Sequence, residues 1–104
     1  MGDKMPDDTF AFAPPPFRPA DALIALRRQL RDLRLAERGD GYELKGVRVA
    51  ELAASETSIE ARLARKPSRQ VPEWDRFTLT DAAQVRKFTD DVKRRLARWT
   101  EEER

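Results

Sequence analysis

The chain has 104 residues, too few for two ordinary domains, and 39% of them are hydrophobic and 38% charged. It contains no cysteine, which excludes disulfides, thiolate nucleophiles and zinc–thiolate sites, and no histidine, which removes the commonest general base and metal ligand. We therefore expect a non-enzymatic protein with no catalytic residue, no metal and no cofactor.

The first 18 residues are rich in proline and predict an extended segment. Pro14-Pro15-Pro16 favours a polyproline II path. Three of the five phenylalanines also lie here, although an unstructured tail rarely carries so much aromatic surface: Phe10, Phe12 and Phe17. Either the segment folds back on the domain, with Phe17 packed most firmly and Phe10 and Phe12 more mobile, or it is an extended peptide offered to a partner.

A single domain is expected over residues 19–100, and it begins with a helix. Pro19 suits the first helical position. Leucines then recur at steps of three and four residues up to about Glu37, which predicts an amphipathic helix: Leu23, Leu26, Leu30 and Leu33. Gly39-Asp40-Gly41 should end this helix in a turn.

The next segments predict a hairpin and a second helix. Short runs of strand-forming residues flank Lys45-Gly46, which favours a β-hairpin over about 42–50. Thr57 to Glu60 has the pattern of a capping box, so a helix is expected from there to about Arg65, with Ile59 and Leu63 buried. A longer helix starting near position 50 is an alternative.

The last third of the chain predicts a strand and a long helix. Trp74 to Thr80 alternates in the manner of a strand. Asp81 should cap a final helix whose apolar residues recur at helical spacing: Val85, Phe88, Val92, Leu96 and Trp99. The acidic residues of 101–104 oppose the helix dipole, so this end should fray.

Together these elements predict an α+β domain with the order α-β-β-α-β-α. We expect a three-stranded, mainly antiparallel sheet with the helices packed on one face, because each element has one apolar side that needs cover. The function that this predicts is a protein-interaction or assembly module, bound to a protein partner or to a second copy in a homodimer. The candidate contact residues are Phe10, Phe12, Phe17 and Trp74.

Nucleic-acid binding is the alternative interpretation. It would use the basic run at 62–69 and the last helix, provided that both lie on one surface: Arg62, Arg65, Lys66, Arg69, Arg94 and Arg98. The net charge is only +2, and sixteen arginines with fourteen alanines are typical of a GC-rich, bacterial-type genome. The excess of arginine is therefore weak evidence for this interpretation.

The cellular location is expected to be the cytoplasm, without membrane contact. No apolar run approaches the roughly 18 residues that span a bilayer. The first 16 residues also lack the cationic start and apolar core of a secretion signal.

Overall fold

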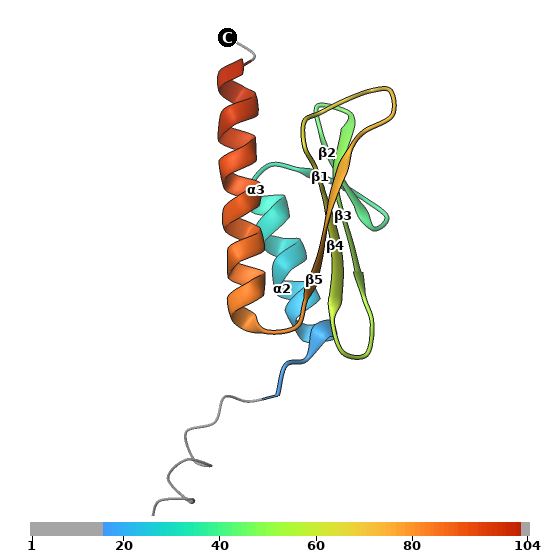
Figure 1. Ribbon diagram of the computed structural model, residues 1–104, viewed down its shortest axis with the longest axis vertical. Helices are drawn as coiled ribbons and strands as arrows, with labels where there is room; N and C mark the ends of the chain where they lie inside the picture. Colours follow the sequence, from blue (N-terminus) through green and yellow to red (C-terminus); the bar gives the residue numbers. More distant parts are fainter. Residues whose placement is uncertain (1–15, 103–104) are drawn as a thin grey trace, which may run out of the picture.

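The computed structural model describes residues 16–102, so the predicted contacts Phe10 and Phe12 lie outside the described residues. Both helices of this part lie on one face of an antiparallel sheet and leave the other face uncovered (Figure 1). The elements are α2 (Pro19–Asp32), β1 (Ala36–Arg38), β2 (Gly41–Leu44), β3 (Val47–Ala54), β4 (Ile59–Ala64), β5 (Trp74–Leu79) and α3 (Ala82–Glu102). The strands are ordered β1 to β5 across the sheet, as in the sequence.

The fold is α+β, but the predicted three-stranded sheet and the order α-β-β-α-β-α are wrong. Residues 16–102 form five strands and two helices in the order α-β-β-β-β-β-α. The predicted second helix, from Thr57 to about Arg65, is instead the end of a turn and the strand β4, and the longer alternative from about position 50 would also have covered the end of β3. Ile59 and Leu63 are four residues apart. Residues at this spacing lie on the same side of a helix, and also on the same face of a strand, so the spacing does not distinguish the two. Pairing decides between them, because Leu52 on β3 and Ala61 on β4 lie opposite each other and are both buried.

The residues of the predicted capping box close the β3–β4 hairpin instead. Ser55 N donates to Ser58 O at 2.8 Å, and Ser55 Oγ accepts the amides of Thr57 and Ser58 at 3.3 and 3.1 Å. Ser58 Oγ also donates to Glu60 Oε2 at 2.8 Å. Serine and threonine bind free backbone groups in turns as readily as at helix starts, which is why the local pattern was ambiguous.

The first helix is shorter than predicted, and an unpredicted strand follows it. α2 ends at Asp32 rather than near Glu37, and Arg34 has a left-handed backbone with φ +71°. Residues Ala36–Arg38 then pair with β2 as the edge strand β1. The predicted leucine stripe does face the core, since Leu26 and Leu30 are fully buried.

Glu37 on β1 connects the first helix to the sheet. Its carboxylate accepts Arg31 Nη1 at 2.9 Å, Arg27 Nη1 at 3.2 Å and the Tyr42 hydroxyl at 3.0 Å. The hydrogen bonds from Arg31 and then Tyr42 lower the pKa of Glu37. Burial, and then the hydrogen bond to Glu37, raise the pKa of Tyr42 to about 12, so this hydroxyl remains a donor at physiological pH.

The hairpin, the last strand and the last helix form where predicted. Lys45 and Gly46 both have positive φ values, +53° and +82°, as the tight turn between β2 and β3 requires. Asp81 caps α3 through a 2.8 Å hydrogen bond that Gln84 N donates to its Oδ1. Trp99 continues the buried stripe of α3 and is 3% exposed.

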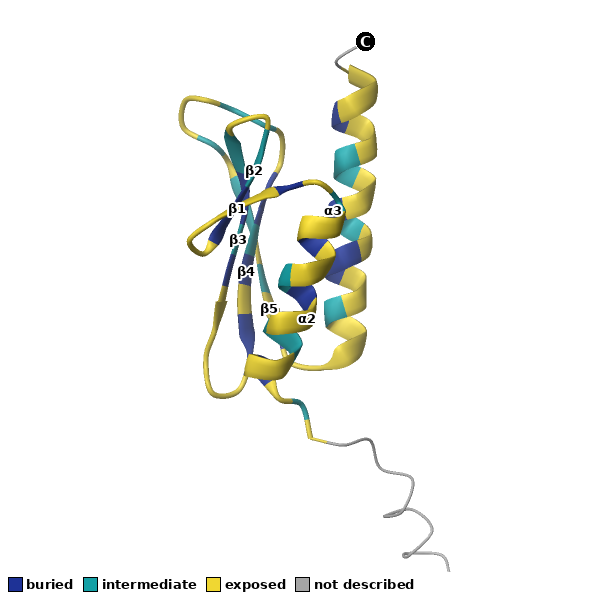
Figure 2. Ribbon diagram, turned by 180° about the vertical axis from the view of Figure 1, so that it is seen from behind, coloured by how far each residue is buried: buried dark blue, intermediate teal, exposed yellow. Residues whose placement is uncertain are grey.

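The core lies between the helices and the sheet, where the buried residues gather (Figure 2). Arg95 on α3 fastens this helix to the sheet: its Nη2 lies 2.8 Å from Asp75 Oδ2, and its Nη1 donates to Ala64 O at 3.0 Å. Arg65 Nε binds the other oxygen of Asp75 at 3.0 Å. The Asp75 carboxylate is therefore shared by two arginines at the α3–β5 contact.

Asp75→Asn should show how far this carboxylate stabilises the domain. Hydrogen bonds from Arg65 and then Arg95 lower its pKa. A carboxylate whose pKa is lower in the folded state than in the unfolded state stabilises the fold when the pH is above its unfolded-state pKa, about 3.9. This stabilisation is lost as the pH falls through the folded-state pKa. We expect the variant to unfold at lower urea concentration than the wild type at pH 7, with the difference shrinking as the pH falls below the unfolded-state pKa of about 3.9. Asp90→Asn, on the exposed side of α3, is the control, and equal urea midpoints at pH 7 for all three proteins would contradict the role of Asp75.

Candidate functional site

The uncovered face of the sheet carries the polar residues that alternate with the core residues. On β4, Ile59, Ala61 and Leu63 are buried beneath the helices, so Glu60 and Arg62 point to the opposite side. Cross-strand pairing places further polar side chains on the same face: Glu51 and Arg76 lie opposite Arg62, and Thr78 lies opposite Glu60.

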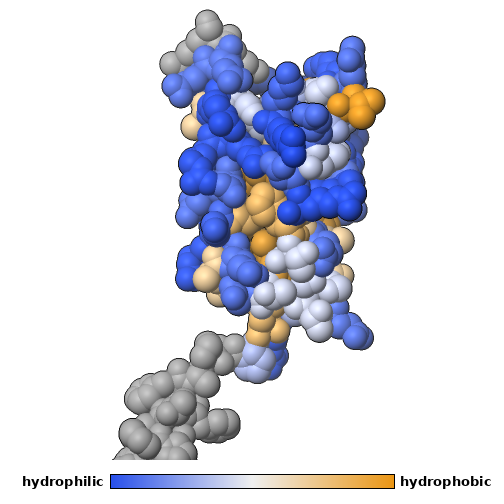
Figure 3. All heavy atoms as spheres, in the orientation of Figure 1, coloured by the Kyte–Doolittle hydropathy of each residue, from blue (hydrophilic) through white to orange (hydrophobic). Residues whose placement is uncertain are grey.

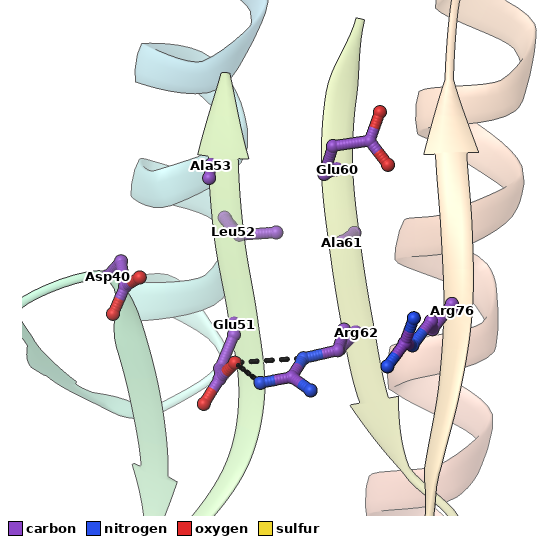
Figure 4. A pocket seen from close by; sticks show the side chains of 8 residues that line it. All are labelled: Asp40, Glu51, Leu52, Ala53, Glu60, Ala61, Arg62 and Arg76. Carbon is purple, nitrogen blue, oxygen red and sulfur yellow. Dashed lines mark hydrogen bonds and ion pairs between the residues drawn. The ribbon is translucent and has the colours of Figure 1, made fainter. Parts of the chain in front are cut away.

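Glu51 is the central carboxylate of this face. Its Oε1 accepts Arg62 Nε at 2.9 Å and also contacts Arg62 Nη2 (Figure 4). Its Oε2 accepts Arg48 Nε at 2.7 Å, and Arg48 Nη2 reaches Asp40 Oδ1 at 2.7 Å. Gly41 leaves room for this arrangement, because a Cβ at that position would collide with the Arg48 guanidinium. One carboxylate thus neutralises arginines from two strands.

Arg76 differs from these arginines because no carboxylate among residues 16–102 forms an ion pair with it. Its side chain is exposed, and it forms no ion pair or hydrogen bond with any residue that the structure describes. It also lies directly opposite Arg62, and like charges in this position repel. Figure 4 shows Arg76 extending toward Arg62 at a pocket of about 300 Å³. The lining residues are Asp40, Glu51, Leu52, Ala53, Glu60, Ala61, Arg62 and Arg76.

Trp74 adds an aromatic ring to this face. The Arg62 Cζ atom lies 5.1 Å from the centroid of the ring, at the distance of a cation–π contact. The side chain is half-buried, so the ring is neither sealed in the core nor fully free. It also borders a second pocket of about 330 Å³ beside Arg48 and Arg69. We refer to Trp74, Arg62 and Arg76 as the Trp74 cluster.

The other predicted contact residue within the described chain, Phe17, lies elsewhere. It is half-buried before the start of α2 and packs against the core. With Pro16 and the first turn of α3 it lines a groove of about 690 Å³ between the two helices. The predicted contact residues Phe17 and Trp74 are therefore not brought together.

The residues of the nucleic-acid interpretation do not share one surface. Arg62 lies on the uncovered face, whereas α3, which carries Arg94 and Arg98, packs on the opposite face (Figure 1). Asp75 binds Arg65, and Asp91 binds Arg94. Lys66 and Arg69 are exposed in the loop after β4, where Arg69 Nη2 lies 3.5 Å from Lys45 O. This interpretation stays a prediction, without the common surface that it requires.

Sequence reasoning missed three members of the uncovered face: Arg48, Glu51 and Arg76. Arg48 lies in the predicted hairpin, whereas Glu51 lies in β3 beyond the expected end of that hairpin, where a longer helix is the alternative prediction. The neighbouring strand β4 does show an alternation with a period of two, because the polar residues Glu60 and Arg62 alternate with Ile59, Ala61 and Leu63. That alternation would have indicated a strand with a polar outer face.

Glu51→Gln should destabilise the domain by about 0.5–1 kcal/mol at low salt, because it removes the anion between Arg48 and Arg62 in a partly exposed setting. Added salt screens the remaining repulsion, so the loss should shrink between about 0.01 and 1 M NaCl. Glu60→Gln is the matched control, since Glu60 accepts hydroxyls of Ser58 and Thr78 rather than cations. Urea unfolding at both salt concentrations measures the effect, and an equal salt response in both variants would contradict it.

Comparison of the chain with family models, with curated proteins and with solved structures finds no match. Within residues 16–102, no three acidic side chains are grouped so that they could hold a metal ion. In the same part of the chain, no helix has the length and apolar character needed to cross a membrane. The geometry of the uncovered face is therefore the basis for proposing a function.

Proposed function

We propose that the chain is a non-enzymatic protein-interaction module that binds a protein partner, or a second copy, through the uncovered face of its sheet. The observation that carries this proposal is the Trp74 cluster. Two arginines oppose each other there, one of them, Arg76, forms no ion pair with any residue of 16–102, and a half-exposed tryptophan lies beside them. The cluster offers a ring and cations, which bind well, but no nucleophile with an adjacent base.

The chemistry of the cluster suits a partner with an acidic side chain. Tryptophan and arginine are the residues most enriched among those that dominate binding energy at interfaces. A partner carboxylate placed near Arg76 would form charge-assisted hydrogen bonds and offset the repulsion between Arg76 and Arg62. The stacked Arg62 also restrains the Trp74 ring before binding, which reduces the entropy lost on association.

The uncovered face is large enough for such a contact. Five strands at a spacing of about 4.8 Å, and a longest strand of eight residues at about 3.3 Å each, give at most about 24 by 26 Å, or about 600 Å². A stable interface buries about 800 Å² on each partner. This face therefore fits a contact that is somewhat smaller than a typical stable interface. We therefore expect binding that depends strongly on a few residues.

A photo-crosslinking amino acid at Ala53 tests this proposal in the native host. Ala53 is exposed and lines the pocket that also contains Arg62 and Arg76 of the Trp74 cluster, whereas the matched control position, Lys93, is exposed on α3. We expect a discrete covalent adduct from position 53, none from position 93, and loss of the adduct in Trp74→Ala and Arg76→Glu. An adduct that persists in both variants, or that forms equally at position 93, would contradict the assignment of this face.

Tryptophan emission distinguishes this proposal from nucleic-acid binding. Trp99 is 3% exposed, so a change on titration will come mainly from Trp74, which contacts Arg62. We expect single- and double-stranded oligonucleotides to leave the emission unchanged at both low and high salt. A change at low salt that disappears steeply as salt rises would favour the nucleic-acid interpretation instead.

A further inference from the structure

The two edges of the sheet differ in how well they are protected. Edge strand β1 has three residues, two of them charged, and short charged edges resist the addition of another strand. β5 has six residues, WDRFTL, with neither a proline nor an irregularity in its pairing with β4. Within residues 16–102, no strand pairs with the outer side of β5.

The outer side of β5 offers regularly spaced backbone groups. Arg65 N donates to Glu73 O at 2.9 Å, which makes these two residues a hydrogen-bonded pair just beyond the strands. Such pairs alternate along an antiparallel ladder, so the backbone groups of Asp75, Phe77 and Leu79 bond to β4. The N–H and C=O groups of Trp74, Arg76 and Thr78 therefore point outward from the sheet.

An apolar groove runs beside this edge, on the side of the helices. It has a volume of about 220 Å³ and is visible as an exposed apolar strip between α3 and β5 (Figure 3). Phe77 and Phe88 meet in it edge to face, with ring centroids 5.2 Å apart. The lining residues are Phe77, Thr78, Leu79, Gln84, Lys87, Phe88 and Asp91. A strand added to β5 would place every second side chain in this groove.

The N-terminal segment has the pattern that such a strand requires. In Phe10-Ala11-Phe12-Ala13 a large side chain alternates with a small one. Alternate residues of an extended chain point to the same side, so both phenylalanines would enter the groove while both alanines lie on the uncovered face. Strand addition of this kind takes affinity from backbone hydrogen bonds and specificity from alternate side chains.

The anchor point of the segment lies close enough for it to reach β5 of its own chain. Pro16 lines the groove between the helices together with Thr80, Asp81 and Ala82, so it lies beside the connection that follows β5. The three residue steps from Ala13 to Pro16 would cover about 9 Å in a polyproline II path. Moving back from Pro16, the chain would enter the open edge at the Leu79 end. Proline has no amide donor, so pairing would stop at Ala13.

We propose that residues 10–13 of the same chain add to β5 as a further strand, parallel to it, with Phe10 and Phe12 in the groove lined by Phe77, Leu79 and Phe88. The larger groove between α2 and α3 is also apolar. However, it has no free strand edge with which the alternating residues 10–13 could pair. The proposal concerns the edge of the sheet and the N-terminal segment, and it does not depend on the function proposed for the uncovered face.

Amide hydrogen exchange of the full-length chain tests the pairing. We expect the amides of Arg76 and Thr78 to exchange at least about tenfold more slowly in the wild type than in the double variant Phe10→Ser/Phe12→Ser, because the variant loses the strand that covers them. The amide of Phe77, which bonds to β4, is the internal control and should be equally protected in both proteins. Equal exchange at Arg76 and Thr78 in the two proteins would overturn the proposal, including the case in which the rings occupy the groove between the helices.

Engineered disulfides identify which chain supplies the strand, because the natural sequence contains no cysteine. Ala11→Cys combined with Thr78→Cys, or with Arg76→Cys to allow for register, should oxidise to a monomer with an internal disulfide. The pair Ala11→Cys/Lys93→Cys is the control and should stay reduced. A disulfide-linked dimer would overturn addition within one chain in favour of a second copy. The proposed strand would be overturned if the disulfide formed no more readily than in the control pair. It would also be overturned if the disulfide still formed after Phe10→Ser/Phe12→Ser was added.

Discussion

Most features of this domain depend on the burial of one face of the sheet beneath two helices. A row of apolar residues crosses β3, β4 and β5 under the helices and fixes the register of these pairings: the buried Leu52 and Ala61 and the partly buried Phe77. A shift of one residue would move this row to solvent, so the register is strongly specified. The same register places Glu51, Arg62 and Arg76 in line on the other face. The arrangement of the uncovered face is thus a consequence of how the core is packed.

The charged residues act differently on the two faces of the sheet. On the helix side, Asp75 and Glu37 each accept arginine side chains, and these contacts join the helices to the strands. On the uncovered side, the ion pairs through Glu51 are partly exposed and contribute little to stability. Their effect is to keep this face polar and to hold Arg62 over the Trp74 ring. Arg76, on the same face, forms no ion pair within the part of the chain that the structure describes.

The two proposals concern neighbouring parts of the structure and are connected through β5. Arg76 and Thr78 present their side chains to the uncovered face and their backbone groups to the open edge. A strand formed by residues 10–13 would widen the uncovered face, with its alanines next to the Trp74 cluster. Docking of the N-terminal segment would then restrain β5, the strand that carries Trp74 and Arg76. The aromatic N-terminal segment and the partner surface would act as one unit.

The sequence by itself determined the elements whose signals are local. The turn at Lys45-Gly46 follows from two positive φ angles, and the start of α3 follows from the Asp81 cap. The apolar stripe of α3 and the alternation of β5 likewise depend on residues a few positions apart. The absence of cysteine and histidine was equally plain, and it limited the chemistry to be considered.

Only the tertiary structure decided the region from 50 to 65 and the candidate site. Ile59 and Leu63 satisfy a helix and a strand equally well, so the choice came from pairing with β3 and β5. The opposition of Arg62 and Arg76 joins residues 14 positions apart, across a loop whose path no local pattern specifies. Cross-strand contacts form only when the helices bury one face of the sheet, and that is why the chain alone does not reveal which polar residues will share the other face.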